Sequence, residues 1–387
     1  MAPSTLSTRR RSTPPAAAPA AAPTLTGYRP GTSVLFTAPG QTLLTQGRRD
    51  LITAPLPDLP DRVAAALADA PAGSLATGAI TFDGATSHLI VPEHVTWSGP
   101  FPSVRTRRSP AAWTITPVPT AEHYLTSVQR ALDLITGGSL DKVVLARALD
   151  LHADQPIDVR DLLARLTGRG RHVFAVPLPD QRTLLGASPE LLISRHGRQI
   201  TTMPLAGSAA RSTDPLTDRQ RAQQLQRSVK DRHEHRLVID AIADALQPYC
   251  THLHVPYEPT LLPTPTMWHL ATTITGRLRD EVPSLTLAAA LHPTPAICGT
   301  PTATARTALT ELELLDRGFY GGLVGWTDAT GDGEWALTIR CAETRGHTLR
   351  LWAGAGIVTG SDPEHELAET SAKFRTLLQG LGVTAFV

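Results

Sequence analysis

The chain has 387 residues, of which 41% are hydrophobic and 18% are charged, which predicts a soluble globular protein and excludes wholesale disorder. The 36 basic residues nearly balance the 35 acidic ones, so a net charge of +1 provides no overall field that would attract nucleic acid or an anionic membrane. No apolar run is long enough for a membrane span, and the three cysteines form no CxxC pair. We therefore expect a cytoplasmic protein without a disulfide framework or a cysteine zinc site.

The first segment of the chain differs from the rest in composition. Residues 1–25 are rich in proline, alanine, serine and threonine, and they contain no acidic residue. Such a segment buries too little apolar surface to offset its ordering entropy, so we predict a disordered tail. It has no apolar region of a secretory signal, and its prolines disfavour the amphipathic helix of a transit peptide. The remaining residues, 26–387, are predicted to form a single catalytic domain.

The middle of the chain alternates predicted strands with few helices. Apolar residues at helical spacing, followed by two glycines, predict a helix at Ala121–Thr136. Short apolar runs between turns predict strands, and their close spacing without intervening helices favours antiparallel pairing. These strands are expected at Ser33–Thr37, Ser87–Val91, Trp113–Val118, Lys142–Leu151, His172–Pro177, Arg182–Gly186, Leu191–His196 and Gln199–Met203.

The C-terminal half is predicted to contain two long helices around further strands. One helix should run from about Asp218 to Gln247, where Pro248 ends it, and the other from Pro363 to Leu381. Strands are expected at Leu323–Trp326, Glu334–Cys341 and Thr348–Ala353.

Lysine is rare in this chain, and its positions are informative. Only Lys142, Lys230 and Lys373 occur among the 36 basic residues. Arginine keeps its proton, whereas a desolvated lysine can lose it, so these lysines are candidates for chemistry that arginine cannot perform. The alternative, for each taken alone, is an ordinary surface lysine. Lys142 begins an apolar strand, where it could be buried or could extend to solvent.

Carboxylates at apolar positions form a second signal. Glu190 lies between two strand-like runs, where a raised pKa would suit a general acid, although a solvated turn glutamate is the alternative. Glu234 continues the apolar face of the long helix, and Glu366 and Glu369 share one side of the last helix with Lys373. Carboxylates on two helices, without clustered Cys or His, indicate a hard cation such as Mg²⁺, unless they form a solvated salt-bridge face.

Anion-binding features complete the set. Gly207 in PLAGSAAR and Gly354 in a predicted loop, Ala353–Gly356, could present backbone N–H groups to a carboxylate. Arg340 is placed on an otherwise apolar strand, and a buried arginine usually binds a carboxylate or phosphate. The glycines lack the strand–GxGxxG–helix context of a dinucleotide site.

Ten segments, in order over about residues 120–380, resemble the chorismate-utilising enzymes, and most closely the isochorismate synthases. They are LDKVVLAR, GASPELL, PLAGSAAR, SVKDRHEHRLV, HLATTITGRL, HPTPAICGTP, FYGGLVGW, GDGEWALTIRCAE, LWAGAGIV and ELAETSAKF. The resemblance implies an α/β chorismate-binding fold, in which two large antiparallel sheets pack as a sandwich with helices outside.

The resemblance also implies a Mg²⁺-dependent conversion of chorismate to isochorismate, in which water adds at C2 and the C4 hydroxyl leaves. Lys142 corresponds to the general base and Glu190 to the general acid. Glu234 and Glu369 match the metal ligands, and Glu366 matches a residue that holds a metal-bound water. The implied substrate-binding positions are Gly207, His269, Ala296, Arg340, Gly354 and Lys373.

Residues within the same motifs separate the alternatives. Lys142 argues against the anthranilate synthases, so no glutaminase subunit is expected, and Ala206 stands where aminodeoxychorismate synthases often have lysine. Salicylate synthases, which go on to eliminate pyruvate, are the remaining alternative, although they tend to have threonine at the position of Ala296. A non-catalytic acid-binding protein would not need Lys142 and Glu190 together. Whether the product feeds a siderophore, a quinone or salicylate is left open by the sequence.

Overall fold

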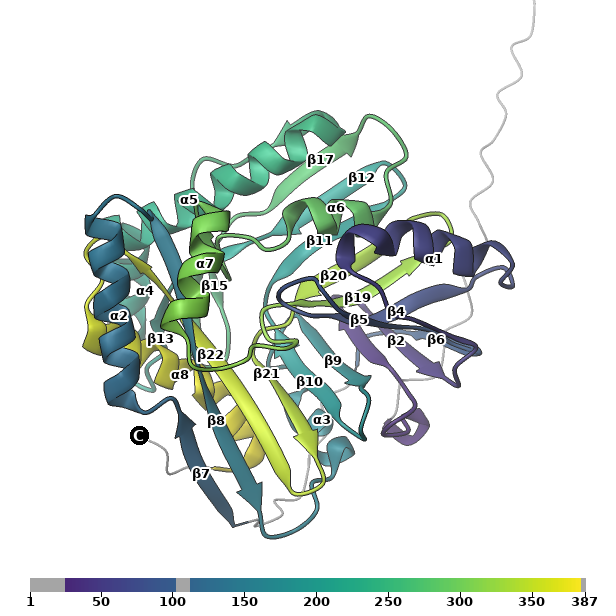
Figure 1. The fold of residues 1–387 in the computed structure, drawn as a ribbon, viewed down its shortest axis with the longest axis horizontal. Coiled ribbons are helices and arrows are strands. Elements are labelled where there is room, and N and C mark those ends of the chain that lie inside the picture. The colour runs from purple at the N-terminus through teal and green to yellow at the C-terminus, as the bar shows by residue number, and fades with distance from the viewer. Residues whose placement is uncertain (1–24, 102–111, 384–387) are drawn as a thin grey trace, which may run out of the picture.

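A computed structural model describes residues 25–101 and 112–383 as two large antiparallel sheets, one small sheet and helices outside them (Figure 1). The predicted disordered tail lies outside the described residues, except for Leu25. No helix within the described part of the chain is long and apolar enough to cross a membrane.

The first large sheet joins strands from both ends of the chain. Its order is β18-β8-β22-β21-β10-β9-β1-β2-β6, and β7 also pairs with β8. The strands are β1 (Leu35–Ala38), β2 (Gln41–Gln46), β6 (His94–Ser98), β7 (Trp113–Val118), β8 (Lys142–Ala153), β9 (His172–Pro177), β10 (Thr183–Ser188), β18 (Gly299–Thr300), β21 (Cys341–Arg345) and β22 (Thr348–Val358).

The second large sheet has the order β14-β17-β12-β11-β20-β19-β4-β5-β3. Its strands are β3 (Asp50–Ile52), β4 (Leu75–Ile80), β5 (Ser87–Val91), β11 (Leu191–His196), β12 (Gln199–Met203), β14 (Cys250–His254), β17 (Ile274–Leu278), β19 (Leu323–Asp328) and β20 (Gly333–Leu337). A small third sheet, not anticipated from the sequence, has the order β13-β16-β15. It consists of β13 (Leu205–Ala210), β15 (Thr260–Pro263) and β16 (Met267–Ala271).

One of the buried apolar clusters lies between the two large sheets. Phe174 of β9 and Ala336 of β20 belong to one buried cluster, which places apolar faces of both sheets against each other. The helices are α1 (Leu59–Ala68), α2 (Ala121–Thr136), α3 (Val159–Leu166), α4 (Pro215–Arg227), α5 (Val229–Leu246), α6 (Ser284–Leu291), α7 (Thr302–Leu312) and α8 (Pro363–Leu381). Three short 3₁₀ turns cover Leu25–Gly27, Leu56–Asp58 and Gln247–Tyr249. The fold class expected from the resemblance is therefore confirmed, since large antiparallel sheets carry helices on their outer faces (Figure 1).

The predicted long helix is wrong in one respect, because it is two helices that meet at Ser228. The backbone of Ser228 is extended, with φ −64° and ψ 119°, so α4 ends there. The Ser228 hydroxyl accepts a hydrogen bond from the Asp231 backbone N–H at 3.2 Å and caps the start of α5. Helical periodicity does not reveal such a break, since both sides of it remain helical.

Two further predictions around the strands are wrong. The predicted strand Glu334–Cys341 stops at Leu337, and Arg340 adopts a left-handed φ of 51° before β21 begins at Cys341. Arg340 therefore lies on a bend and not on a strand. The predicted loop Ala353–Gly356 is instead the continuation of β22, which pairs with β8 along its whole length.

Candidate active site

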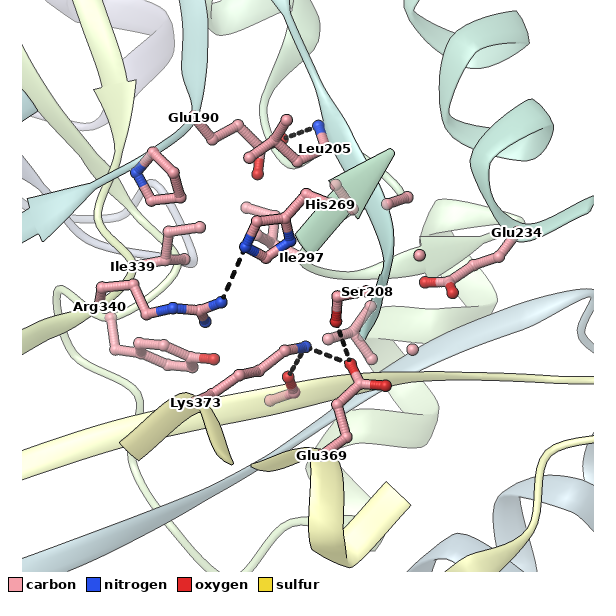
Figure 2. A pocket seen from close by; sticks show the side chains of 18 residues that line it. Glu190, Leu205, Ser208, Glu234, His269, Ile297, Ile339, Arg340, Glu369 and Lys373 are labelled. Atoms are coloured by element: carbon pink, nitrogen blue, oxygen red, sulfur yellow. Dashed lines mark hydrogen bonds and ion pairs between the residues drawn. The ribbon is translucent and has the colours of Figure 1, made fainter. Parts of the chain in front are cut away.

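A pocket forms where the small sheet meets α5, α8 and the strands β8 and β22 of the first large sheet (Figure 2). Nine of the eleven predicted site residues line it. They are Glu190, Gly207, Glu234, His269, Ala296, Arg340, Gly354, Glu369 and Lys373. Lys142 and Glu366 do not line the pocket. Lys142 forms an ion pair with the pocket residue Glu234, and Glu366 forms one with Lys230.

Lys142 is held directly behind the pocket wall. Its side chain, at the start of β8, is fully buried, and Nζ lies 2.9 Å from Oε1 of Glu234 on α5. The pair needs the space left by Gly356 of β22, because a Cβ there would overlap Glu234 Oε1 and would approach Lys142 Cε to 3.0 Å. This glycine therefore serves close side-chain packing and not the N–H donation that a loop would have provided.

Glu190 occupies the turn between β10 and β11 with only 3% of its surface exposed. The Leu205 backbone N–H donates a hydrogen bond to Oε1 at 3.2 Å. Burial raises the pKa of Glu190 to about 8, against the lowering effects of that hydrogen bond and of the charges on Lys142, Arg340 and Lys373. The side chain is therefore protonated at neutral pH and can donate a proton into the pocket.

The last helix contributes a carboxylate and a lysine to the pocket floor. Lys373 Nζ lies 2.6 Å from Glu369 Oε1 and donates a hydrogen bond to the Gly354 carbonyl oxygen at 2.7 Å. The Ser208 hydroxyl donates to the same Glu369 oxygen at 3.0 Å. Gly207, next to Ser208, has a left-handed φ of 79° within an irregular part of β13, which favours glycine at that position.

Arg340 and His269 face each other across the pocket (Figure 2). Arg340 Nη2 lies 3.5 Å from His269 Nε2, and no carboxylate among the described residues forms an ion pair with this guanidinium. Burial lowers the pKa of His269 well below its ordinary value, and the charges on Arg340 and Lys373 lower it further. His269 is therefore neutral, and Arg340 presents an uncompensated positive charge to the pocket.

Each predicted metal-site carboxylate is paired with one of the chain's three lysines. Glu234 pairs with Lys142, Glu369 with Lys373, and Glu366 with Lys230, whose Nζ lies 2.5 Å from Glu366 Oε1.

The three carboxylates surround one region but do not form a preassembled ligand set. All three raise the pKa of the Lys230 ammonium against the opposing effect of burial, and the other oxygen of Glu366, Oε2, is buried without a hydrogen-bond partner. Within the described ranges, no three acidic, His or Cys side chains converge as a ready metal site. The donor chemistry fits a hard cation such as Mg²⁺, provided that lysine contacts are exchanged for the metal.

Several contributors were not predicted from the sequence. Ser208 and Tyr320 line the pocket, and His235 is buried behind it, with Nδ1 3.1 Å from the Ala206 carbonyl oxygen and Nε2 2.8 Å from Thr272 Oγ1. These contacts hold α5 against β13, and thus Glu234 against the pocket. The only signal for His235 in the sequence was its position directly after Glu234. That signal was weak, because neighbouring helical residues point in different directions.

Comparison with known proteins agrees with this geometry. The sequence model described as chorismate binding enzyme matches residues 101–382. The chain is 47% identical to isochorismate synthase DhbC of Bacillus subtilis over 378 residues, covering 92% of this chain and 95% of the relative. It is 42% identical to isochorismate synthase EntC of Escherichia coli over 342 residues, covering 84% and 88%.

A solved structure is similar over nearly the whole chain. The crystal structure of a putative 2,3-dihydroxybenzoate-specific isochorismate synthase, DhbC from Bacillus anthracis, superposes with a TM-score of 0.88 at 44% identity, covering 93% of this chain and 98% of that one. The resemblance inferred from the ten sequence segments is thus confirmed, and the chain belongs to the chorismate-binding enzyme family.

Proposed function

We propose that this protein is an isochorismate synthase, an isomerase that adds water at C2 of chorismate and removes the C4 hydroxyl. The observation that carries the proposal is Glu190, a buried carboxyl with a pKa of about 8 in a pocket that is also lined by the cations Arg340 and Lys373. Hydroxide is a poor leaving group, so a protonated acid at that position supplies what the reaction requires. The names of the relatives DhbC of Bacillus subtilis and EntC of Escherichia coli, both isochorismate synthases, support the same reaction.

The pocket charges suit a dianionic substrate. Chorismate carries two carboxylates, and Arg340 is a buried cation without a carboxylate partner in the described part of the chain. A guanidinium can donate two parallel hydrogen bonds to a carboxylate, which fixes both its position and its orientation. Lys373, already held by Glu369 and the Gly354 carbonyl, supplies a second positive charge nearby. We propose that these two cations orient the substrate relative to Glu190.

Lys142 is proposed as the base that takes a proton from the attacking water. In the pair with Glu234 the ammonium has no free electron pair, so it cannot act as a base in that state. The role therefore requires that the Glu234 carboxylate be bound by another cation. We propose that Glu234 and Glu369 bind Mg²⁺, with Glu366 beside them. When bound, the ion would polarise a substrate carboxylate as a Lewis acid.

The pocket residues also bear on which product is released. No observation favours the salicylate synthase alternative, because Ala296 and Ile297 present apolar side chains to the pocket, where a hydroxyl would be expected. We further propose that residues 26–387 act as one catalytic domain in the cytoplasm without a glutaminase subunit.

Product analysis tests the proposal. Purified protein is incubated with chorismate and Mg²⁺, and the products are separated by chromatography over a time course. We expect isochorismate to accumulate toward an equilibrium mixture with chorismate, and we expect a chelator to stop the conversion. Salicylate and pyruvate appearing at the rate of chorismate consumption would instead identify a salicylate synthase. Full activity after removal of all divalent metal would exclude the proposed metal role.

A further inference from the structure

Lys230 is the one lysine of the chain for which the proposed reaction assigns no role. It lies in the first turn of α5, one helical turn before Glu234, and its side chain is 30% exposed. The side chains of Lys142 and Lys373, which both act in the proposed reaction, are only 0% and 13% exposed. Lys230 is thus the lysine of this cluster with the freest access to solvent.

The position of Lys230 is unfavourable for a cation except for its carboxylate neighbours. A positive charge near a helix N-terminus is opposed by the helix dipole. What stabilises the ammonium there is Glu366 at 2.5 Å, and the charges of Glu234 and Glu369 add to this. Glu366 is itself only 1% exposed, so without Lys230 its charge would be buried unpaired beside a second carboxylate.

We propose that Lys230 is a placeholder cation, which neutralises the Glu366 carboxylate while the metal is absent and moves into solvent when Mg²⁺ binds. Lysine suits this role because its charge is carried on a flexible stem and makes no bidentate pair that must be broken. The inference rests on the Mg²⁺ site of the proposed function. It adds that the protein carries an internal competitor for its own metal.

The sign of the effect on metal affinity distinguishes a placeholder from a supporting residue. Lys230→Met keeps the aliphatic stem and removes the competing charge, so we expect Mg²⁺ to bind roughly tenfold more tightly. Lys230→Arg keeps the charge and can pair with Glu366 through two hydrogen bonds, so we expect weaker Mg²⁺ binding than in the wild type. A residue that merely orients Glu366 for the metal would give the opposite result in Lys230→Met.

Isothermal titration calorimetry of Mg²⁺ into metal-free, chorismate-free protein measures these affinities without any turnover. Thermal denaturation gives a second readout: metal-free Lys230→Met should melt below the wild type, and Mg²⁺ should raise its Tm by more. Arg236→Met is the matched control, since Arg236 lies on the same helix, is half-exposed and forms its ion pair with Asp240, away from the carboxylate cluster. If Lys230→Met does not fold, Lys230→Gln and Lys230→Arg provide the same comparison.

The outcomes separate this inference from the proposed function. Mg²⁺ binding in Lys230→Met that is unchanged or weaker than in the wild type and the control would overturn the placeholder role, even if the wild type makes isochorismate. An absence of Mg²⁺ binding by the wild-type protein would overturn it as well. The expected order of Mg²⁺ affinities is Lys230→Met above wild type above Lys230→Arg. This order would support the inference even if the product assay revealed a different reaction.

Discussion

Two buried arginines on opposite sides of the pocket wall differ in how their charge is satisfied. Both are buried, since Arg317 is 5% exposed and Arg340 is 8% exposed. Arg317 donates two hydrogen bonds to Glu313, at 2.6 and 2.8 Å, one to the Ile297 carbonyl at 2.7 Å and one to the Val144 carbonyl at 2.6 Å. Arg340 makes a single long contact with His269 at 3.5 Å.

This difference distinguishes a structural charge from a functional one. Burial by itself would lower the pKa of Arg317, but Glu313 raises it above its ordinary value, whereas burial lowers the pKa of Arg340. Burying a charge without a partner reduces the stability of the fold. Such a charge is retained at functional sites, where a ligand supplies the partner. The Arg317–Glu313 pair also fixes Ile297 and Val144, whose side chains line the pocket. The Arg317–Glu313 ion pair therefore stabilises the pocket wall, whereas Arg340 is left without a carboxylate partner until the substrate binds.

The largest expected effect is on catalysis. It concerns Lys142, which belongs with Arg340 to the groups proposed to act in the reaction. Lys142→Ala should lower kcat by about 10²–10⁴-fold and leave KM for chorismate little changed, because the lysine acts on water and not on the substrate's charges. Steady-state kinetics measure both constants. Lys142→Arg should be nearly as damaging, since arginine keeps its proton. A loss confined to KM, with kcat retained, would rule out the base assignment.

The second prediction is that replacing Arg317, the arginine with a carboxylate partner, lowers the stability of the protein. Arg317→Met should reduce the free energy of unfolding by about 3–5 kcal/mol, because it leaves the Glu313 carboxylate buried and unpaired. Arg340→Met should change it by less than about 1 kcal/mol, since no partner is left behind. Chemical denaturation measures both values. The double variant Arg317→Met/Glu313→Leu should recover part of the loss, and equal destabilisation by the two single variants would contradict the comparison.

A smaller effect is expected when Arg340→Met is assayed with substrate. Loss of charge-assisted hydrogen bonds to a carboxylate costs about 1.5–3 kcal/mol, which corresponds to roughly a 10- to 100-fold fall in kcat/KM. Kinetics at varied chorismate concentration provide the value. Lys is the informative conservative replacement, since Arg340→Lys keeps the charge but not the bidentate geometry, and it should recover only part of the activity. Wild-type kinetics in Arg340→Met would show that Arg340 does not bind the substrate.

The smallest effect concerns pH and sharpens the role of Glu190. Because its pKa is raised to about 8, the carboxyl is protonated below that pH and loses its proton above it. Loss of this proton should lower kcat/KM roughly tenfold per pH unit above about pH 8. A pH profile with Mg²⁺ held saturating provides the measurement. Glu190→Gln should be poorly active and should lack this alkaline limb, whereas an unchanged limb in that variant would assign it to another group.

Much of the local structure could be predicted from the sequence because it depends on residues close in the chain. The helices α2 and α8 and the strands β9, β11 and β12 have the predicted bounds, since apolar periodicity and flanking turn residues specify them directly. The break at Ser228 and the left-handed bend at Arg340 could not be predicted in this way. Both interrupt segments whose apolar pattern continues on either side.

The identity of the candidate site residues was also available from the sequence, through the rarity of lysine, the carboxylates at apolar positions and the ordered family motifs. What only the tertiary structure decided is how these residues are paired. Lys142 meets Glu234, Lys230 meets Glu366, and Ser208 meets Glu369, each across segments that are distant in the chain. Chain spacing specifies which residues share a face of one helix or strand, but charge pairing in a buried site depends on distances between elements, and those are set by how the sheets and helices pack.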